Sequence, residues 1–332
     1  MKVHSMSIVV EDRRCNANCP YCISKMTGFD FEEFKKESED RKDWPPEHID
    51  EVNWHNFEKA MAFARNCGVS TVLLTGKGEP TIQPRLIQRY VARLGCNFPF
   101  VELQTNGLLL LDEKYDHWLQ RWYDEGLNTI AISVPHYIED RCGMVFSGGK
   151  SKKYIDLPAL VRKLKDIGYT VRINCVMFDH WRSTDPDKYQ LEPRDIRGIN
   201  NMADVKNFIG CVYEDWGVGK GLGADQLTFT PMRRPINPNN DEVARWVDQH
   251  SFPDDEFLRK IREFLHKEAM LLLQLPHGAE VFDYQGHNVC LNDCLTLNKD
   301  PEQLRQLIFF PDGRLCYDWQ YHGAILLGGT LG

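Results

Sequence analysis

Apolar residues along the chain occur in short runs that alternate with stretches of helical periodicity. Each run is bounded by turn-forming residues, which is typical of buried strands. The runs predict six strands, at 7–10, 71–75, 100–104, 129–134, 170–177 and 226–231. In the intervening stretches, apolar residues recur at the spacing of one helix face. These stretches predict five helices, at 54–67, 84–94, 112–125, 157–167 and 203–216.

Strands and helices that alternate in this way indicate an α/β fold, with parallel strands joined by right-handed crossovers. The pattern changes after residue 234, where a stretch rich in Pro and Asn (235–240) breaks it,. Two further helices are predicted at 241–250 and 254–273, and short strands follow them. Residues 308–317 read as a β-hairpin around Asp312 and Gly313,.

The chain has 332 residues, of which 42% are hydrophobic and 27% charged, as is ordinary for a soluble globular protein,. No apolar run approaches the ~20 residues that a membrane-spanning helix needs. The net charge of −8 argues against a broad nucleic-acid interface, which needs a basic face,. We therefore expect neither a membrane nor a nucleic acid as partner. The eleven cysteines are an odd number and no apolar signal stretch is present, so we expect a reducing, cytoplasmic location,.

Three cysteines stand close together after the first predicted strand, at the spacing C-x3-C-x2-C: Cys15, Cys19 and Cys22. Asn18 and Pro20 between them favour turns, as a loop around an inorganic centre requires,. Iron–sulfur cubes are normally held by four cysteines, so three would leave one iron of a [4Fe–4S] cluster open to a small molecule. A structural zinc site is the alternative, and it needs a fourth ligand.

The triad, with Tyr21 directly before its third cysteine, resembles the signature of the radical S-adenosylmethionine (SAM) enzymes. After the second strand, the sequence from Gly76 to Pro80 resembles the Gly-Gly-Glu-Pro motif of that family. Lys77 replaces the usual first glycine of the motif, which bears on the subfamily rather than on the family. The glycines would let the backbone approach a ligand closely, and Glu79 would offer its carboxylate to the amino group of SAM.

The resemblance implies a partial (β/α)6 TIM-like barrel over residues 1–234, with chemistry at the carboxyl ends of its strands. Residues 235–332 would be an α+β extension, helical and with a β-hairpin, that closes the barrel mouth. In the family the amino and carboxylate groups of SAM chelate the open iron, and reductive cleavage of SAM yields a 5′-deoxyadenosyl radical that abstracts hydrogen from substrate. The positions that would contact SAM here are Tyr21, Gly76, Gly78, Glu79, Pro80, Thr105, Asn106, Ser133, Asn174, Thr230 and Met232.

Two insertions, at 28–49 and 135–154, are expected to influence substrate choice, because loops at this face of a barrel often bind ligands. Arginines bind carboxylate or phosphate groups through paired donors, so Arg172, Arg233 and Arg234 suggest an anionic substrate,. The alternative is that these arginines pair with the many acidic residues of the chain.

The C-terminal region resembles extensions that carry auxiliary iron–sulfur clusters in members that modify peptides and cofactors. Its candidate ligands are Cys290, Cys294 and Cys316, although the position that is cysteine after the Asp-Gly turn of such members is Asp318 here. Core packing is the alternative explanation, because free cysteines are among the most buried residues.

Together these features predict a radical SAM enzyme with a small-molecule, cofactor-precursor or peptide substrate. Its electron donor would be a flavodoxin or a ferredoxin. One alternative is a radical SAM enzyme that modifies tRNA or another RNA, since the G-x-G-E-P motif also resembles branches related to tRNA wybutosine synthesis. The other is a non-catalytic iron–sulfur or zinc protein.

Overall fold

The computed structural model describes residues 2–11, 14–27, 52–182, 195–213, 223–275, 278–292, 303–319 and 323–329. Its strands are β1 (Lys2–Glu11), β2 (Thr71–Gly76), β3 (Phe100–Thr105), β4 (Thr129–Ser133), β5 (Thr170–Met177), β6 (His180–Arg182), β7 (Asp195–Arg197), β8 (Gln226–Pro231), β9 (Met270–Gln274), β10 (Glu280–Tyr284), β11 (His287–Leu291), β12 (Gln303–Phe309), β13 (Leu315–Cys316) and β14 (Ile325–Leu327).

The α-helices are α2 (Trp54–Asn66), α3 (Pro84–Leu94), α4 (Asp116–Asp124), α5 (Glu139–Phe146), α6 (Leu157–Ile167), α7 (Met202–Tyr213), α8 (Asp241–His250) and α9 (Glu256–Glu268). Three short 3-10 helices accompany them: η1 (Ile23–Met26), η3 (Pro80–Ile82) and η4 (Glu113–Tyr115). The predicted insertion at 28–49 lies outside the described residues.

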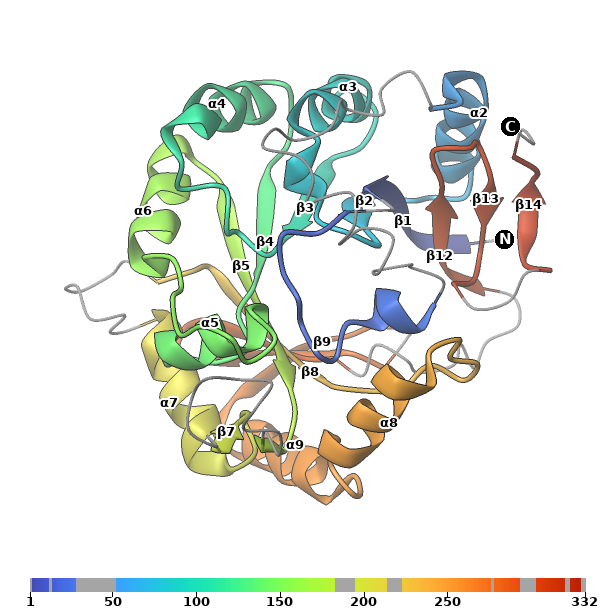
Figure 1. Ribbon diagram of the computed structural model, residues 1–332. Helices are drawn as coiled ribbons and strands as arrows, with labels where there is room; N and C mark the ends of the chain where they lie inside the picture. The colour runs from blue at the N-terminus through green and yellow to red at the C-terminus, as the bar shows by residue number, and fades with distance from the viewer. Residues whose placement is uncertain are drawn as a thin grey trace.

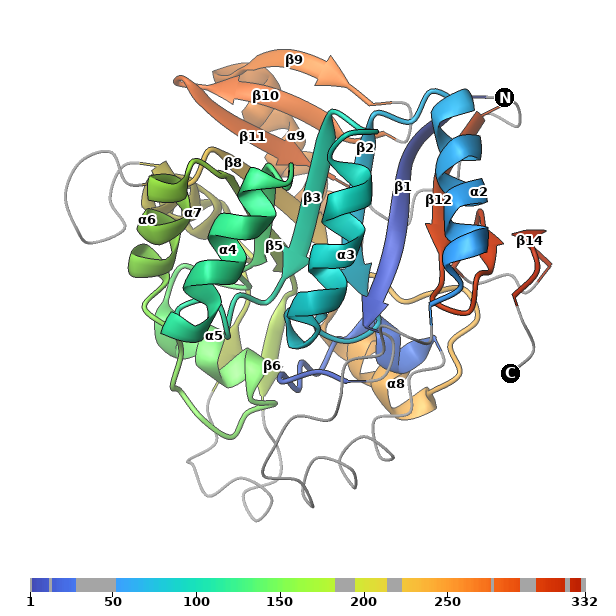
Figure 2. The same cartoon turned by 90° about the horizontal axis from the view of Figure 1, so that it is seen from above.

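The sheet is an open barrel whose six central strands are parallel, in the order β1-β2-β3-β4-β5-β8. The strands curve around the barrel axis, with helices α3, α4, α6 and α7 on the outside (Figure 1). Seen from the side, the strands run toward the end where η1, α5 and α8 gather (Figure 2). The partial (β/α)6 barrel expected from the sequence is therefore confirmed.

The C-terminal region adds strands to both edges of this same sheet. On one edge β12 pairs with β1 in parallel and leads to β13 and β14. On the other edge β11 pairs with β8 in parallel and leads to β10 and β9. The predicted hairpin is present between β12 and β13, and Gly313 adopts a φ of 91° in its turn.

Alternating side chains of the central strands divide between a dry outer face and a polar inner face. In β5 the buried residues Val171, Ile173 and Cys175 belong to the main core, which also contains the buried faces of the outer helices. The residues between them, such as Arg172 and Asn174, are partly exposed on the concave side. Hydrophobic burial thus holds the helices outside and leaves the interior of the barrel for polar chemistry.

The structure differs from the sequence prediction in several elements, among them the strands β6 and β7, which were not predicted. The helix predicted at 254–273 ends at Glu268, and Met270–Gln274 instead forms the edge strand β9. A run of leucines fits either element, and pairing with β10 decides for the strand,. Helix α5 was not predicted at all. Within the described residues, no helix is long and apolar enough to cross a membrane.

Candidate active site

The three cysteines lie on a curled loop between the end of β1 and η1. The backbone N–H of Cys22 donates to the carbonyl of Cys19 (3.3 Å), which closes a turn within the triad. The ammonium of Lys25 donates to the Asn18 side chain and to the carbonyl of Cys19, both at 2.8 Å. The loop conformation is therefore held by its own polar groups and leaves the sulfur atoms for another partner.

Burial and neighbouring charge act on the thiols of this loop. Burial, with a contribution from Cys22, raises the pKa of Cys19 to about 12. Burial, then Glu79 and then the other two thiols raise the pKa of Cys15 well above its usual value. Iron cations bound at these buried thiols would favour the thiolate form.

No three His, Cys, Asp or Glu side chains within the described ranges converge on a single metal-ion position. This arrangement does not match a closed zinc site, in which all ligands meet at one ion. Three thiolates that bind three different irons of a cube need not meet at one point. The donor set, three thiols on one short loop, is the set that three irons of a [4Fe–4S] cluster require,.

The turn between β2 and η3 is docked on the cysteine loop through its backbone. The N–H of Gly78 donates to the carbonyl of Glu11 (3.0 Å), and the N–H of Glu79 donates to that of Arg14 (2.8 Å). A Cβ atom on Gly78 would overlap the Arg14 carbonyl oxygen, and one on Gly76 would lie 2.5 Å from that of Glu11. These glycines thus allow close approach of the cysteine loop, whereas the sequence had suggested approach of a ligand.

Lys77, the residue that departs from the family motif, also ties the turn to the cysteine loop. Its ammonium donates to the carbonyl of Thr27 at 2.7 Å, just after η1. The lysine at this position thus adds a contact between the turn and the segment that follows the cysteines.

Glu79 is buried, and hydrogen bonds surround one of its carboxylate oxygens. Oε1 accepts from the N–H and hydroxyl of Thr81 (3.0 and 2.6 Å) and from the hydroxyl of Thr105 (2.7 Å). Oε2 accepts from the N–H of Asn106 (2.9 Å). Burial raises the pKa of Glu79, and these hydrogen bonds oppose the rise. Because a carboxylate oxygen accepts two bonds, Oε2 retains capacity for a ligand ammonium group.

The third motif touches the cysteine loop as well. The side-chain amide of Asn106 donates to the Asn16 side chain at 2.7 Å. Thr105 and Asn106 therefore bridge Glu79 and the loop that carries the triad. The structure brings together the cysteines, the Glu79 turn with Pro80, and the Thr-Asn-Gly turn after β3.

Polar residues on neighbouring strands form a row across the concave face of the barrel. The strand register places Ser133 beside Asn174, Asn174 beside Thr228, and Thr228 beside Cys290. All four are partly exposed. Two predicted SAM contacts, Ser133 and Asn174, thus share a level of the barrel with a threonine and a thiol. Burial raises the pKa of Cys290 to about 11, so this thiol is neutral at pH 7.

An apolar cluster lies where β8 ends and the cysteine loop crosses the mouth. Met232 is buried there with Phe178, and Tyr21 packs against the cluster. The ring of Tyr21 lies 5.8 Å from that of Phe178 and 6.4 Å from that of Trp246 in α8. Tyr21 and Met232 are therefore brought together, and Thr230 lies beside Val176, which packs against the same cluster.

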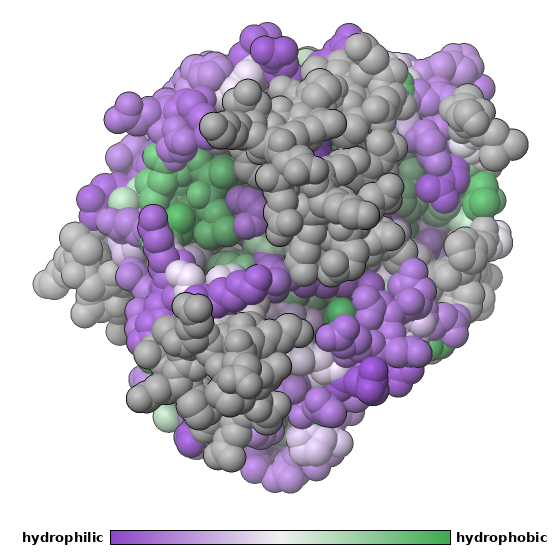
Figure 3. All heavy atoms as spheres, in the orientation of Figure 1, coloured by the Kyte–Doolittle hydropathy of each residue, from purple (hydrophilic) through white to green (hydrophobic). Residues whose placement is uncertain are grey.

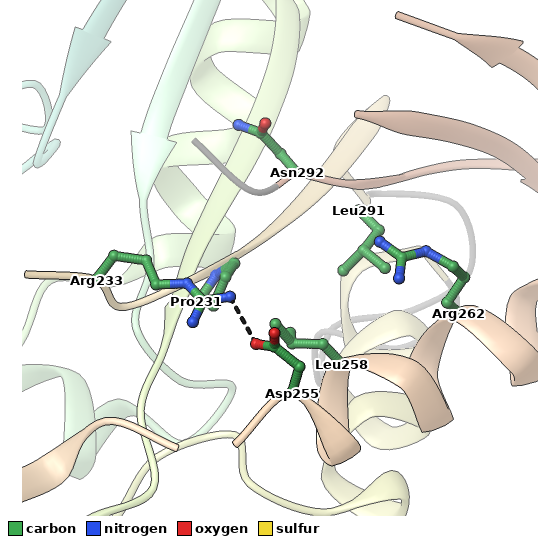
Figure 4. A pocket seen from close by; sticks show the side chains of 7 residues that line it. All are labelled: Pro231, Arg233, Asp255, Leu258, Arg262, Leu291 and Asn292. Carbon is green, nitrogen blue, oxygen red and sulfur yellow. Dashed lines mark hydrogen bonds and ion pairs between the residues drawn. The ribbon is translucent and has the colours of Figure 1, made fainter. Parts of the chain in front are cut away.

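The predicted arginines do not meet at the mouth, because each pairs with a different carboxylate. Arg172 lies near the amino end of β5 and contacts Glu102 at 2.6 Å. Arg233 lines a pocket of about 80 Å³ with Arg262 and points toward Asp255, its partner at 2.8 Å (Figure 4). Arg234 pairs with Asp248 at 3.1 Å. The sequence analysis left open whether these arginines bind a substrate or pair with acidic residues, and in the structure each of them pairs with an acidic residue.

Two candidate ligands of an auxiliary cluster lie on strands that are added at different edges of the six central strands. Cys290 is in β11, beyond β8, whereas Cys316 is in β13, beyond β12. Cys316 packs with Val9 and Phe310 in a separate apolar cluster. Cys294 lies outside the described residues. The two cysteines thus lie on strands added at different edges of the sheet, and a cluster that they share stays a prediction.

Helix α5, in the insertion at 135–154, supports the cysteine loop. The N–H of Asn18 donates to the carbonyl of Phe146 at the end of α5 (2.6 Å). Gly148, with a φ of 65°, follows so closely that a Cβ would lie 2.8 Å from the Asn18 side chain. Glu139 and Asp140 in the first turn of α5 are the sequence signal that could have predicted this helix,. Part of the insertion expected to choose the substrate therefore shapes the cofactor loop.

An apolar area beside the mouth is visible in the space-filling view, over the loop between β3 and α4 (Figure 3). This loop carries the partly buried leucines Leu108, Leu109 and Leu111, which pack against the main core. The rim of the barrel thus combines polar groups with apolar surface.

His136, just after β4, is a buried imidazole whose surroundings disfavour protonation. Its Nδ1 accepts from the N–H of Ile138 (2.9 Å), and its Nε2 lies 2.7 Å from the guanidinium of Arg141. Burial first and then Arg141 lower the pKa of His136 to about 3, while Asp204 acts in the opposite direction. The folded protein therefore holds His136 neutral down to strongly acidic pH.

This histidine makes stability depend on pH in a defined direction. Below a pH of about 6.5 the unfolded chain binds a proton at His136 that the folded protein does not, so stability falls as pH falls toward 3,. Between pH 6.5 and 5 the expected loss is about 2 kcal/mol. Urea unfolding of iron-free wild type and His136→Asn at both pH values measures it, with His117→Asn at an exposed site as control. An equal change of unfolding free energy with pH in wild type and His136→Asn would contradict this prediction.

The sequence matches the model of the Radical SAM superfamily over residues 12–181, which is just over half of the chain. A curated relative, the 7,8-dihydro-6-hydroxymethylpterin dimethyltransferase of Methanocaldococcus jannaschii, is 28% identical over 224 residues. That match covers 65% of this chain and 35% of the relative, so the chain spans about a third of the relative's length.

Among solved structures, the fold is similar to that of SuiB from Streptococcus suis bound to precursor peptide SuiA. The TM-score is 0.52 at 12% sequence identity, over 99% of this chain and 62% of that one. At this identity the similarity concerns the fold alone.

Proposed function

Because the chain belongs to the radical SAM superfamily, we propose that it is an enzyme that uses a [4Fe–4S] cluster and SAM to abstract hydrogen from a substrate. When bound, these cofactors supply one-electron cleavage of SAM and a 5′-deoxyadenosyl radical. The protein supplies binding, orientation and exclusion of competing reactions.

In this proposal each part of the site has a role that follows from its chemistry. The three thiolates of the cysteine loop would hold the cluster. Glu79 would accept a hydrogen bond from the amino group of SAM through Oε2, the less occupied oxygen. Ser133 and Asn174 would offer polar contacts from the concave face. Tyr21 and Met232 would pack against the adenosyl part of SAM, because they belong to the apolar cluster at the mouth.

One observation carries the proposal: three motifs far apart in the sequence are joined into one site. Arg14 beside the triad binds the Glu79 turn, and Glu79 binds both Thr105 and Asn106. Asn106 then returns to the cysteine loop through Asn16. Such mutual support is what a preorganised cofactor site requires.

We propose a small-molecule, cofactor-precursor or peptide substrate. By its name the curated relative methylates a pterin, which is a small molecule, and SuiB was solved with a precursor peptide. The polar row of the barrel suits a substrate with hydrogen-bonding groups near the radical. The electron would come from a flavodoxin or ferredoxin. None of the ten cysteines that the structure describes forms a disulfide with another. A reducing, cytoplasmic setting is part of the proposal.

Anaerobic turnover tests the proposal directly. The protein is reconstituted with iron and sulfide, mixed with SAM and dithionite, and assayed for 5′-deoxyadenosine by mass spectrometry. Wild type is expected to form 5′-deoxyadenosine, and Cys22→Ala none, because two thiolates hold a cube poorly. Cys96→Ala removes an exposed cysteine outside the site and is the matched control. Equal product from wild type and Cys22→Ala would refute the proposed function.

A further inference from the structure

A buried polar network connects the end of β1, the cysteine loop and the turn before α3. We propose that Glu11, Arg14 and Gln83 are positioning residues that set the cysteine loop against the SAM-binding turn. They would thereby determine how tightly SAM binds to the loaded cluster. This inference rests on the proposed function, and it assigns a role to three residues that lie outside the motifs.

The residues of the network are buried and joined by several hydrogen bonds. Glu11 Oε1 accepts from the backbone N–H of Arg14 at 3.0 Å. Its Oε2 accepts from Nε and Nη2 of Arg14 at 3.0 and 2.8 Å and from Nε2 of Gln83 at 2.8 Å. Glu11 and Gln83 have no exposed surface, and Arg14 exposes 2%. One carboxylate at the end of β1 thus gathers donors from the cysteine loop and from the turn before α3.

The same residues also hold the turn through their backbone. The carbonyls of Glu11 and Arg14 accept from the N–H groups of Gly78 and Glu79, as described above. Arg14 directly precedes Cys15, and Gln83 directly follows η3, which begins after Glu79. A displacement of the Glu11 carboxylate would therefore shift the triad relative to the Glu79 turn.

The use of an ion pair here indicates a geometric role. Desolvation offsets most of the attraction in a buried pair, and apolar replacements of similar volume are often as stable. A buried pair can instead specify one arrangement, since its hydrogen bonds are directional. Glu11 also neutralises the guanidinium that directly precedes the first cysteine. The network thus sets both the orientation and the charge balance beside the cluster.

A second ion pair in the same barrel, whose carboxylate is buried and whose guanidinium is partly exposed, serves as a control. Glu102 in β3 exposes 2% and contacts Arg172 in β5 at 2.6 Å. It lies near the amino ends of the strands, whereas Glu11 lies at the carboxyl end of β1. Changing Glu102 to Gln removes the same charge from a similarly buried place, but away from the cysteine loop.

The test compares Glu11→Gln, Gln83→Met and Glu102→Gln with wild type after reconstitution. Iron content and apo-protein melting temperature are measured first, and SAM affinity then follows from the SAM-induced change in the EPR spectrum of the reduced cluster. We expect Glu11→Gln and Gln83→Met to bind SAM about 10–100-fold more weakly, as outer-shell changes do. Glu102→Gln should remain within about twofold of wild type, because its site is distant.

Gln83→Met keeps the ion pair and decides the question if Glu11→Gln does not fold or retain its iron. The inference is overturned if Gln83→Met, with full iron, binds SAM like wild type. It is also overturned if Glu102→Gln weakens SAM binding as much, since the effect would then follow general destabilisation. If wild type itself shows no SAM-induced spectral change, the proposed function fails instead.

Discussion

Replacing Cys15, Cys19 and Cys22 together with alanine is expected to leave the protein without bound iron. The reconstituted wild type should contain about four irons per chain, and the triple variant close to none. The reason is that no other described cysteines are grouped as the triad is, since Cys290 and Cys316 lie on strands at different edges of the sheet. Iron and sulfide analysis after anaerobic reconstitution and desalting measures the difference.

The matched control for the triple variant is Cys290→Ser combined with Cys316→Ser. This double variant should keep about four irons per chain, because neither thiol lies in the cysteine loop,. Retention of several irons by the triple variant would contradict the prediction. It would point to a second cluster whose ligands include cysteines such as Cys294.

Gly78→Ala is expected to be the most damaging single methyl group that can be added to the site. Its Cβ would overlap the carbonyl oxygen of Arg14 and lie 2.7 Å from the carbonyl carbon. Both atoms belong to the backbone of the cysteine loop, which cannot rotate away as a side chain would. We expect a loss of about 3 kcal/mol in unfolding free energy, the upper range for overpacking. Urea unfolding of the iron-free protein measures it.

Gly78→Ala should also impair the cofactor site in the fraction of the protein that folds. A displaced turn moves Glu79, and with it the hydrogen bonds to Thr105 and Asn106. Gly210→Ala in α7 is the control, because nothing lies within 4 Å of the added Cβ. It should stabilise the protein by about 1 kcal/mol, the helix propensity difference between Gly and Ala. Equal urea midpoints for Gly78→Ala and wild type would show that the turn adapts.

The order of the central elements and the limits of several of them followed from sequence patterns alone. The predicted strands at 170–177 and 226–231 and the helices at 84–94 and 157–167 coincide with β5, β8, α3 and α6. Apolar periodicity determines these elements because each has one face in the main core,. The edge strand β9 was missed because its four apolar residues lie outside that core and its structure depends on pairing with β10.

The cysteine triad and the Glu79 turn were also readable in the sequence, since ligand type and spacing follow the chemistry of the cofactor. Only the tertiary structure identified what connects them. Glu11 and Gln83 are 72 positions apart and meet at one carboxylate. The two glycines proved to accommodate backbone rather than ligand. Hydrogen bonds between distant residues depend on distance and direction in space, which local sequence does not encode. Hydrophobic burial, by contrast, produces a periodic pattern of apolar residues along the chain.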